Sequence, residues 1–90
     1  MYEKTTTIVN KTGLHARPAS VFVAATKGYS SKITIKNLKT GKQADAKSIL
    51  MLLTLALSKG TEVSLSANGE DEVKAVDELV ALIDSGFGEE

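Results

Sequence analysis

The chain has 90 residues, with eleven basic and eleven acidic side chains, no cysteine and a single histidine. Without cysteine there are no disulfides or thiolate metal sites, and one histidine argues against a zinc site. The longest apolar run is far shorter than a membrane span and the N-terminus is polar, so we expect a soluble cytoplasmic protein with one domain over residues 1–90 and no deep active-site cavity.

The charges are unevenly distributed along the chain. Residues 1–69 hold ten basic and three acidic side chains, a net charge of +7, whereas residues 70–90 hold one basic and eight acidic side chains, a net charge of −7. A basic body suits nucleic acid or an acidic protein partner. Because the lysines are scattered and Arg17 is the only arginine, the sequence argues against nucleic acid.

The first half of the chain predicts a strand, a helix and a second strand. Residues 2–9, YEKTTTIV, are rich in β-branched side chains and predict the first strand. A helix follows Pro18 and can end at Gly28. Its buried face is predicted from residues at i, i+3, i+4 and i+7: Ala19, Phe22, Val23 and Thr26. Residues 31–37, SKITIKN, alternate apolar and polar side chains as a half-buried antiparallel strand does.

The second half predicts two more strands and two more helices. After the turn at 38–42, residues 42–46 predict a weak strand and 49–57 a short helix on the core, capped by Ser48 and closed by Lys59 and Gly60. Residues 61–67 predict a strand, and 70–86 a helix with acidic residues in its first turn and Gly86 as its C-terminal cap. The predicted buried stripe of this last helix is Val73, Val76, Leu79, Val80 and Ile83.

The resulting order is βαββαβα, which indicates an α+β fold in which helices cover one face of an antiparallel sheet. Ferredoxin-like domains share most of this order, so the order alone identifies no function.

The stretch KTGLHARPAS, residues 11–20, holds the only histidine, arginine and proline of the chain. Pro18 suits the first turn of a helix, which places His15 at the helix N-terminus. The backbone N–H groups of Ala16 and Arg17 and the Arg17 guanidinium then form a site that favours phosphate. Because imidazole is a nucleophile near neutral pH, the stretch is suited to holding a phosphoryl group on His15. An ordinary helix start, with His15 on the surface, explains the same spacing.

The stretch GLHARPAS resembles the active-site signature of the HPr family, the phosphocarriers of the bacterial sugar phosphotransferase system, and the likeness extends to the last helix. The resemblance implies an open-faced β-sandwich, with a four-stranded antiparallel sheet and three helices on one face. It implies that His15 takes a phosphoryl group at Nδ1 from phosphorylated enzyme I and passes it to EIIA domains of sugar permeases, while Arg17 steadies the phosphate. Such a carrier is a substrate of other enzymes and not an enzyme itself, with no cofactor or metal, and we expect a monomer.

The resemblance also implies a regulatory site and a docking surface. Ser48 matches a position that an HPr kinase/phosphorylase modifies in some bacteria, which would recruit a transcription regulator. A serine before an apolar helix is equally a common N-cap. Partner docking maps to residues beside the histidine, some of which could instead belong to the core: Ala16, Ser20, Ile49, Leu50 and Leu53.

Two other functions remain open at this point. The NLKTGK turn, residues 37–42, is longer than in many sugar-branch carriers. Together with the ending SGFGEE, it resembles the nitrogen-branch paralogue, which uses a different enzyme I. A regulatory binding module without a carrier role is the other alternative, and His15 argues against it because such modules lack the histidine.

Overall fold

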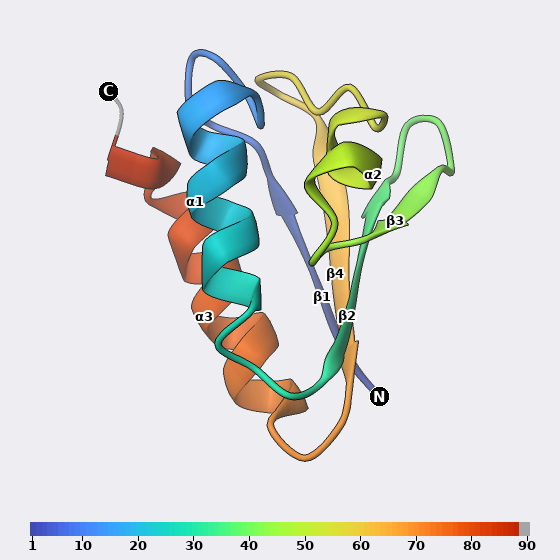
Figure 1. Ribbon diagram of the computed structural model, residues 1–90. Coiled ribbons are helices and arrows are strands. Elements are labelled where there is room, and N and C mark those ends of the chain that lie inside the picture. The colour runs from blue at the N-terminus through green and yellow to red at the C-terminus, as the bar shows by residue number, and fades with distance from the viewer. Residues whose placement is uncertain (89–90) are drawn as a thin grey trace.

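A computed structural model describes residues 1–88 of the chain (Figure 1). The observed order βαββαβα confirms the predicted α+β class. The elements are β1 (Tyr2–Thr7), α1 (Ala16–Thr26), β2 (Lys32–Asn37), β3 (Gln43–Asp45), α2 (Ile49–Leu53), β4 (Glu62–Asn68), α3 (Glu72–Asp84) and a 3₁₀ turn, η1 (Gly86–Gly88).

The four strands form one antiparallel sheet in the order β1-β4-β2-β3, so the last strand of the chain lies inside the sheet. All three α-helices lie on the same side of this sheet (Figure 1), as predicted. Strand alternation explains the two faces: Ile33, Ile35 and Leu65 point under the helices and are buried, while Lys32 and Lys36 point to the open face.

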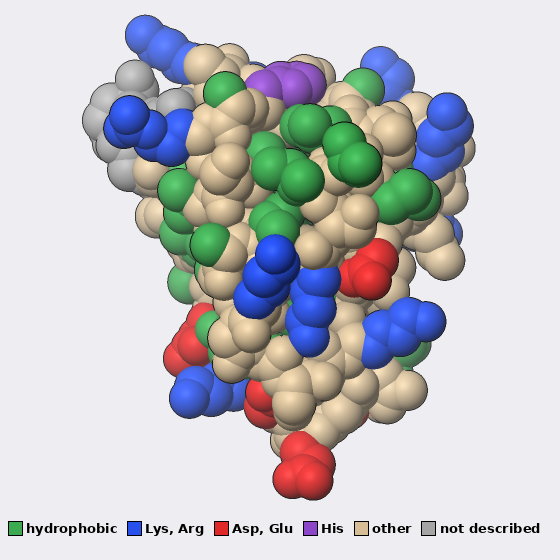
Figure 2. All heavy atoms as spheres, in the orientation of Figure 1, with side chains coloured by type: hydrophobic (Ala, Val, Ile, Leu, Met, Phe, Trp, Pro, Cys, Tyr) green, Lys and Arg blue, Asp and Glu red, His purple; other side chains and the backbone are tan. Residues whose placement is uncertain are grey.

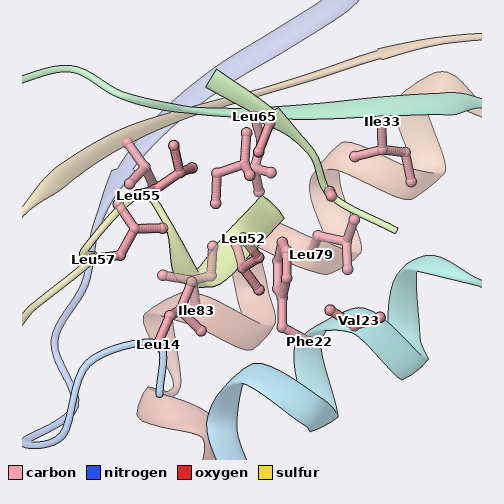
Figure 3. Close-up of a cluster of buried hydrophobic side chains, with 14 of the residues drawn as sticks. Leu14, Phe22, Val23, Ile33, Leu52, Leu55, Leu57, Leu65, Leu79 and Ile83 are labelled. Atoms are coloured by element: carbon pink, nitrogen blue, oxygen red, sulfur yellow. The ribbon is translucent and has the colours of Figure 1, made fainter. Parts of the chain in front are cut away.

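The core lies between the sheet and the three helices. The predicted face of α1 is confirmed, because Ala19, Phe22, Val23 and Thr26 are all buried. In Figure 3, Leu14, Phe22 and Leu52 reach the same cluster from the loop before α1, from α1 and from α2. Since Leu14 directly precedes His15, the core anchors the chain one residue before the predicted site.

The predicted helix over 49–57 is wrong in its second half, because α2 ends at Leu53. Leu55 and Leu57 are both buried in the following loop. Residues two apart on a helix point in nearly opposite directions, so both side chains can enter the core only if the backbone leaves the helix. Gly60 therefore does not close a helix; it has a φ of +91° and donates its N–H to the carbonyl of Ile8 at 2.7 Å, just before β4.

Two other boundaries differ from the sequence prediction. Strand β1 ends at Thr7, two residues before the predicted end, although Ile8 is buried. Helix α3 starts at Glu72, and Val73, which was predicted to be in its buried stripe, is 50% exposed. The buried stripe includes Ala75 together with the predicted Val76, Leu79 and Ile83, because α3 packs on β1, β4 and α1 along this face. Gly86 adopts a φ of +71° just after α3, as predicted for a C-terminal cap.

Asp71 joins the start of α3 to the loop before β2. Its carboxylate accepts hydrogen bonds from the backbone N–H groups of Ser30 at 2.9 Å and Ser31 at 3.0 Å, and from the Ser31 hydroxyl. These donors, the Ser31 hydroxyl first, lower the pKa of Asp71 to about 2. The ionised carboxylate therefore fastens the loop to the helix at neutral pH.

Candidate functional site

His15 lies at the N-terminus of α1 with its side chain in solvent. It is the N-cap residue, with an extended backbone at φ −130° and ψ 161°, and among the described residues its side chain makes no capping hydrogen bond. Figure 2 shows the histidine at one end of the molecule, beside a group of hydrophobic side chains. The imidazole is therefore open to a partner's reactive group.

Backbone amides at the start of α1 lie directly after this imidazole. The Ala19 N–H donates to the His15 carbonyl at 3.4 Å. The N–H groups of Ala16 and Arg17 come before this first hydrogen bond of the helix, and Pro18 has no N–H. The first N–H groups of a helix have no partner within the helix and carry its positive dipole end, so this end favours an anion. Ala16 has a φ of +49°, a conformation that costs a non-glycine residue roughly 1–2 kcal/mol. This strained residue directly follows the exposed histidine. Strained backbone conformations are often found at functional sites.

Arg17 is exposed two residues after His15. No ion pair within residues 1–88 involves its guanidinium. Its donors are thus free to meet a phosphate, in the two-pronged geometry that guanidinium and phosphate share.

Residues before His15 hold the loop in place, and one of them, Asn10, was not predicted from the sequence. Asn10 is 3% exposed, and its Nδ2 donates to the Gly13 carbonyl at 2.8 Å. The Gly13 N–H donates to the Asn10 carbonyl at 3.1 Å, and the Leu14 N–H to the Leu57 carbonyl at 2.8 Å. The signal was present: NKTG has Asn at the first and Gly at the fourth position, as type I β-turns prefer.

Hydrophobic side chains on α1 and α2 form an exposed patch beside the histidine. We name the exposed large hydrophobic side chains of these two helices the α1–α2 patch: Val21, Ile49, Leu50, Met51 and Leu53. Leu50 is the most exposed at 77%, whereas Met51 lies at the side of α2 that faces β2 and β3. The residues predicted for docking are all exposed: Ala16, Ser20, Ile49, Leu50 and Leu53. Of the side chains in α2, only that of Leu52 is buried. The apolar run of α2 thus serves two surfaces, with one residue in the core and four in solvent.

Ser48 is half-buried at the N-cap of α2. Its hydroxyl accepts a hydrogen bond from the Met51 N–H at 3.4 Å, and its own N–H donates to the Asp45 carbonyl at 3.0 Å. The long Ser48–Met51 contact is a weak cap, and the hydroxyl lies one residue from the α1–α2 patch. The geometry thus agrees with a cap and leaves the hydroxyl partly accessible.

Residues 1–88 contain no group of three or more His, Cys, Asp or Glu side chains placed to hold a metal ion. None of the helices there has the length and apolar character that crossing a bilayer requires.

Comparisons with known proteins agree on one family. The family model described as the PTS HPr component phosphorylation site matches residues 2–85. The chain is 52% identical to the phosphocarrier protein HPr of Haemophilus influenzae over 83 residues. The aligned region covers 92% of this chain and 95% of that protein. It is 48% identical to the HPr-like protein Crh of Bacillus subtilis over 73 residues, and the aligned region covers 81% of this chain and 84% of that protein.

A solved structure shows the same fold. The crystal structure of HPr-C-His from Thermoanaerobacter tengcongensis superposes on this chain with a TM-score of 0.94 at 50% sequence identity, covering 100% of this chain and 99% of that one. The shared backbone fold therefore includes the loop before α1 and helices α1 and α2 as well as the sheet.

Proposed function

The chain belongs to the HPr family of phosphotransferase-system phosphocarriers, and we propose that it accepts a phosphoryl group on His15 from phosphorylated enzyme I and donates it to EIIA domains of sugar permeases in the cytoplasm. The observation that carries this proposal is the exposed imidazole of His15 at the N-terminus of α1, next to the amides of Ala16 and Arg17. In this role the chain is a substrate of two partners and completes no turnover alone.

The transfer needs only an open nucleophile and a site for the phosphoryl oxygens. The lone pair of His15 Nδ1 forms the new N–P bond while the donor's bond to phosphorus breaks, and the donor atom keeps its electron pair. The phosphoryl oxygens then lie at the N-terminus of α1, where the Ala16 and Arg17 amides and the Arg17 guanidinium offset their charge. Transfer to EIIA is the same step with His15 as the leaving group.

Both partners are expected to dock on the surface around His15. The predicted docking residues Leu50 and Leu53 belong to the α1–α2 patch, and Ala16 and Ser20 flank it on α1. An apolar centre with a polar rim suits a complex that forms and separates repeatedly. The net positive charge of residues 1–69 favours acidic surfaces on the partners. We propose that the carrier acts as a monomer.

Phosphorylation of Ser48 is a second proposed function, with an HPr kinase/phosphorylase and a transcription regulator as partners. The supporting observation is the partly accessible hydroxyl beside the α1–α2 patch, at the start of α2. A phosphate there adds about two negative charges to an apolar docking surface. Intact mass after incubation with the kinase and ATP should rise by one acid-stable phosphate in the parent and not in Ser48→Ala. An unchanged parent mass would refute this role.

Two other functions remain as alternatives. The β2–β3 turn at 38–42 supports a nitrogen-branch carrier, which keeps the same chemistry with another enzyme I. A regulatory module without carrier function would leave the exposed His15 unused.

The test is intact-mass analysis at neutral pH after incubation with phosphoenolpyruvate and each kind of enzyme I. We expect one acid-labile phosphate from the sugar-branch enzyme in the parent and none in His15→Ala. Labelling only by the nitrogen-branch enzyme would assign the chain to that branch. If neither enzyme labels the parent, the carrier function is refuted.

A further inference from the structure

Among the described residues, the His15 side chain makes no capping hydrogen bond that would fix its position. The backbone before His15 must therefore position the imidazole. The nearest fixed point is the peptide unit between Gly13 and Leu14. Its carbonyl accepts from Asn10 Nδ2 at 2.8 Å, and its N–H donates to the Leu57 carbonyl at 2.8 Å. With both ends bonded, this peptide unit cannot rotate without breaking two hydrogen bonds.

Asn10 also controls the other side of Gly13, because the Gly13 N–H donates to the Asn10 carbonyl at 3.1 Å. Gly13 is therefore held by one residue at both its N–H and its C=O. A second Asn10 contact, from Nδ2 to the Thr12 hydroxyl at 3.4 Å, lies inside the same turn. The four-residue turn is thus closed by the asparagine that begins it.

Asn10 lies next to the turn that follows α3. A Cβ at Gly86 would lie 3.8 Å from both Asn10 Cβ and Val9 Cγ2, which is an ordinary packing distance. Phe87, the next residue, packs its ring edge against Phe22 of α1 with the centroids 6.4 Å apart. Asn10 is 3% exposed, so burial restricts the positions of its side chain, and its amide N–H donates to the Gly13 carbonyl.

We propose that Asn10 is a positioning residue for phosphoryl transfer, which acts by fixing the Gly13–Leu14 peptide and through it the imidazole of His15. This inference rests on the proposed carrier function. Positioning contributes strongly to phosphoryl transfer, and small displacements of a reacting atom lower rates by large factors. Since Asn10 is buried and the docking residues are exposed, its loss should lower the maximal transfer rate and leave partner binding unchanged.

The experiment is single-turnover transfer from phosphorylated enzyme I, measured by rapid quench over a range of carrier concentrations. In Asn10→Ala we expect the maximal rate to fall at least ten-fold, with the half-saturating concentration within about two-fold of the parent value. The matched control is Thr26→Val at the far end of α1. It also removes a buried side-chain hydrogen bond, from Thr26 Oγ1 to the Val23 carbonyl at 2.6 Å, and should leave the rate unchanged.

Thermal unfolding of both variants shows whether they are folded at the assay temperature. If Asn10→Ala is not folded, Asn10→Leu fills the buried position without a donor and carries the same test. A folded Asn10 variant with the parent rate would overturn the inference, as would an equal fall in Thr26→Val or a change confined to the half-saturating concentration. A parent chain that enzyme I does not phosphorylate would overturn the proposed function, and this inference with it.

Discussion

Gly13→Ala should destabilise the protein more than any other glycine-to-alanine change at positive φ. Gly13 has a φ of +69°, and a Cβ there would lie 2.4 Å from the Leu57 carbonyl oxygen and 2.8 Å from Ser58 Cα. Both atoms belong to the backbone and cannot move aside cheaply. The left-handed conformation costs about 1–2 kcal/mol and the overpacking about 1–3 kcal/mol, so we expect a total loss of about 2–5 kcal/mol.

Gly41→Ala is the matched control for this prediction. Gly41 has a φ of +80°, yet nothing lies within 4 Å of the position a Cβ would take. It should therefore show only the conformational cost, about 1–2 kcal/mol. Urea unfolding of the two variants at neutral pH gives the comparison, because small domains usually unfold in a two-state manner. Equal losses in both would refute the claim that the loop before His15 packs rigidly on residues 57 and 58.

Three further predictions concern the two surfaces of α2, the start of α3 and the phosphate site. Leu52→Ala should lower the free energy of unfolding in urea by about 2–5 kcal/mol, because Leu52 is 1% exposed. Leu50→Ala, at a residue that is 77% exposed, should change it by no more than about 0.5 kcal/mol. Similar losses in both variants would contradict the assignment of the two faces of α2. Because the folded pKa of Asp71 lies below its ordinary value of 3.8, the carboxylate stabilises the fold above that value, and the contribution is lost as the pH falls from 3.8 to about 2. Unfolding of Asp71→Asn should thus differ from the parent at pH 6 and converge with it near pH 2, and a constant difference would count against the linkage. Arg17→Gln should slow phosphorylation of His15 roughly ten- to hundred-fold in the enzyme I assay without lowering the unfolding midpoint, while an unchanged rate would remove Arg17 from the site.

The loop before α1 links folding to the proposed chemistry. Leu14 is buried in the core, Gly13 is packed against residues 57 and 58, and His15 follows directly in solvent. A reactive side chain is thereby held at the surface by neighbours that are not themselves exposed. This arrangement explains how a small domain can place an imidazole accurately at its surface.

Several features followed from the sequence alone because they depend on local patterns. The 3.6-residue period identified the buried face of α1, and the alternation in residues 31–37 identified β2. Pro18, which suits the first turn of a helix, placed His15 at a helix start, where the structure has it. The exposure of Leu50 and Leu53 was expected from their place on one face of the short second helix.

Other features were decided only by tertiary structure, because they depend on contacts between distant parts of the chain. The apolar run 49–57 is compatible with a longer helix, and α2 stops at Leu53 because Leu55 and Leu57 must both enter the core. Local sequence likewise contains nothing that pairs β1 with β4 or packs Phe87 against Phe22. Local periodicity thus determined which residues form elements and which face of each is apolar. Where an element ends, and what holds His15 in place, was determined by the single packed core that all the elements share.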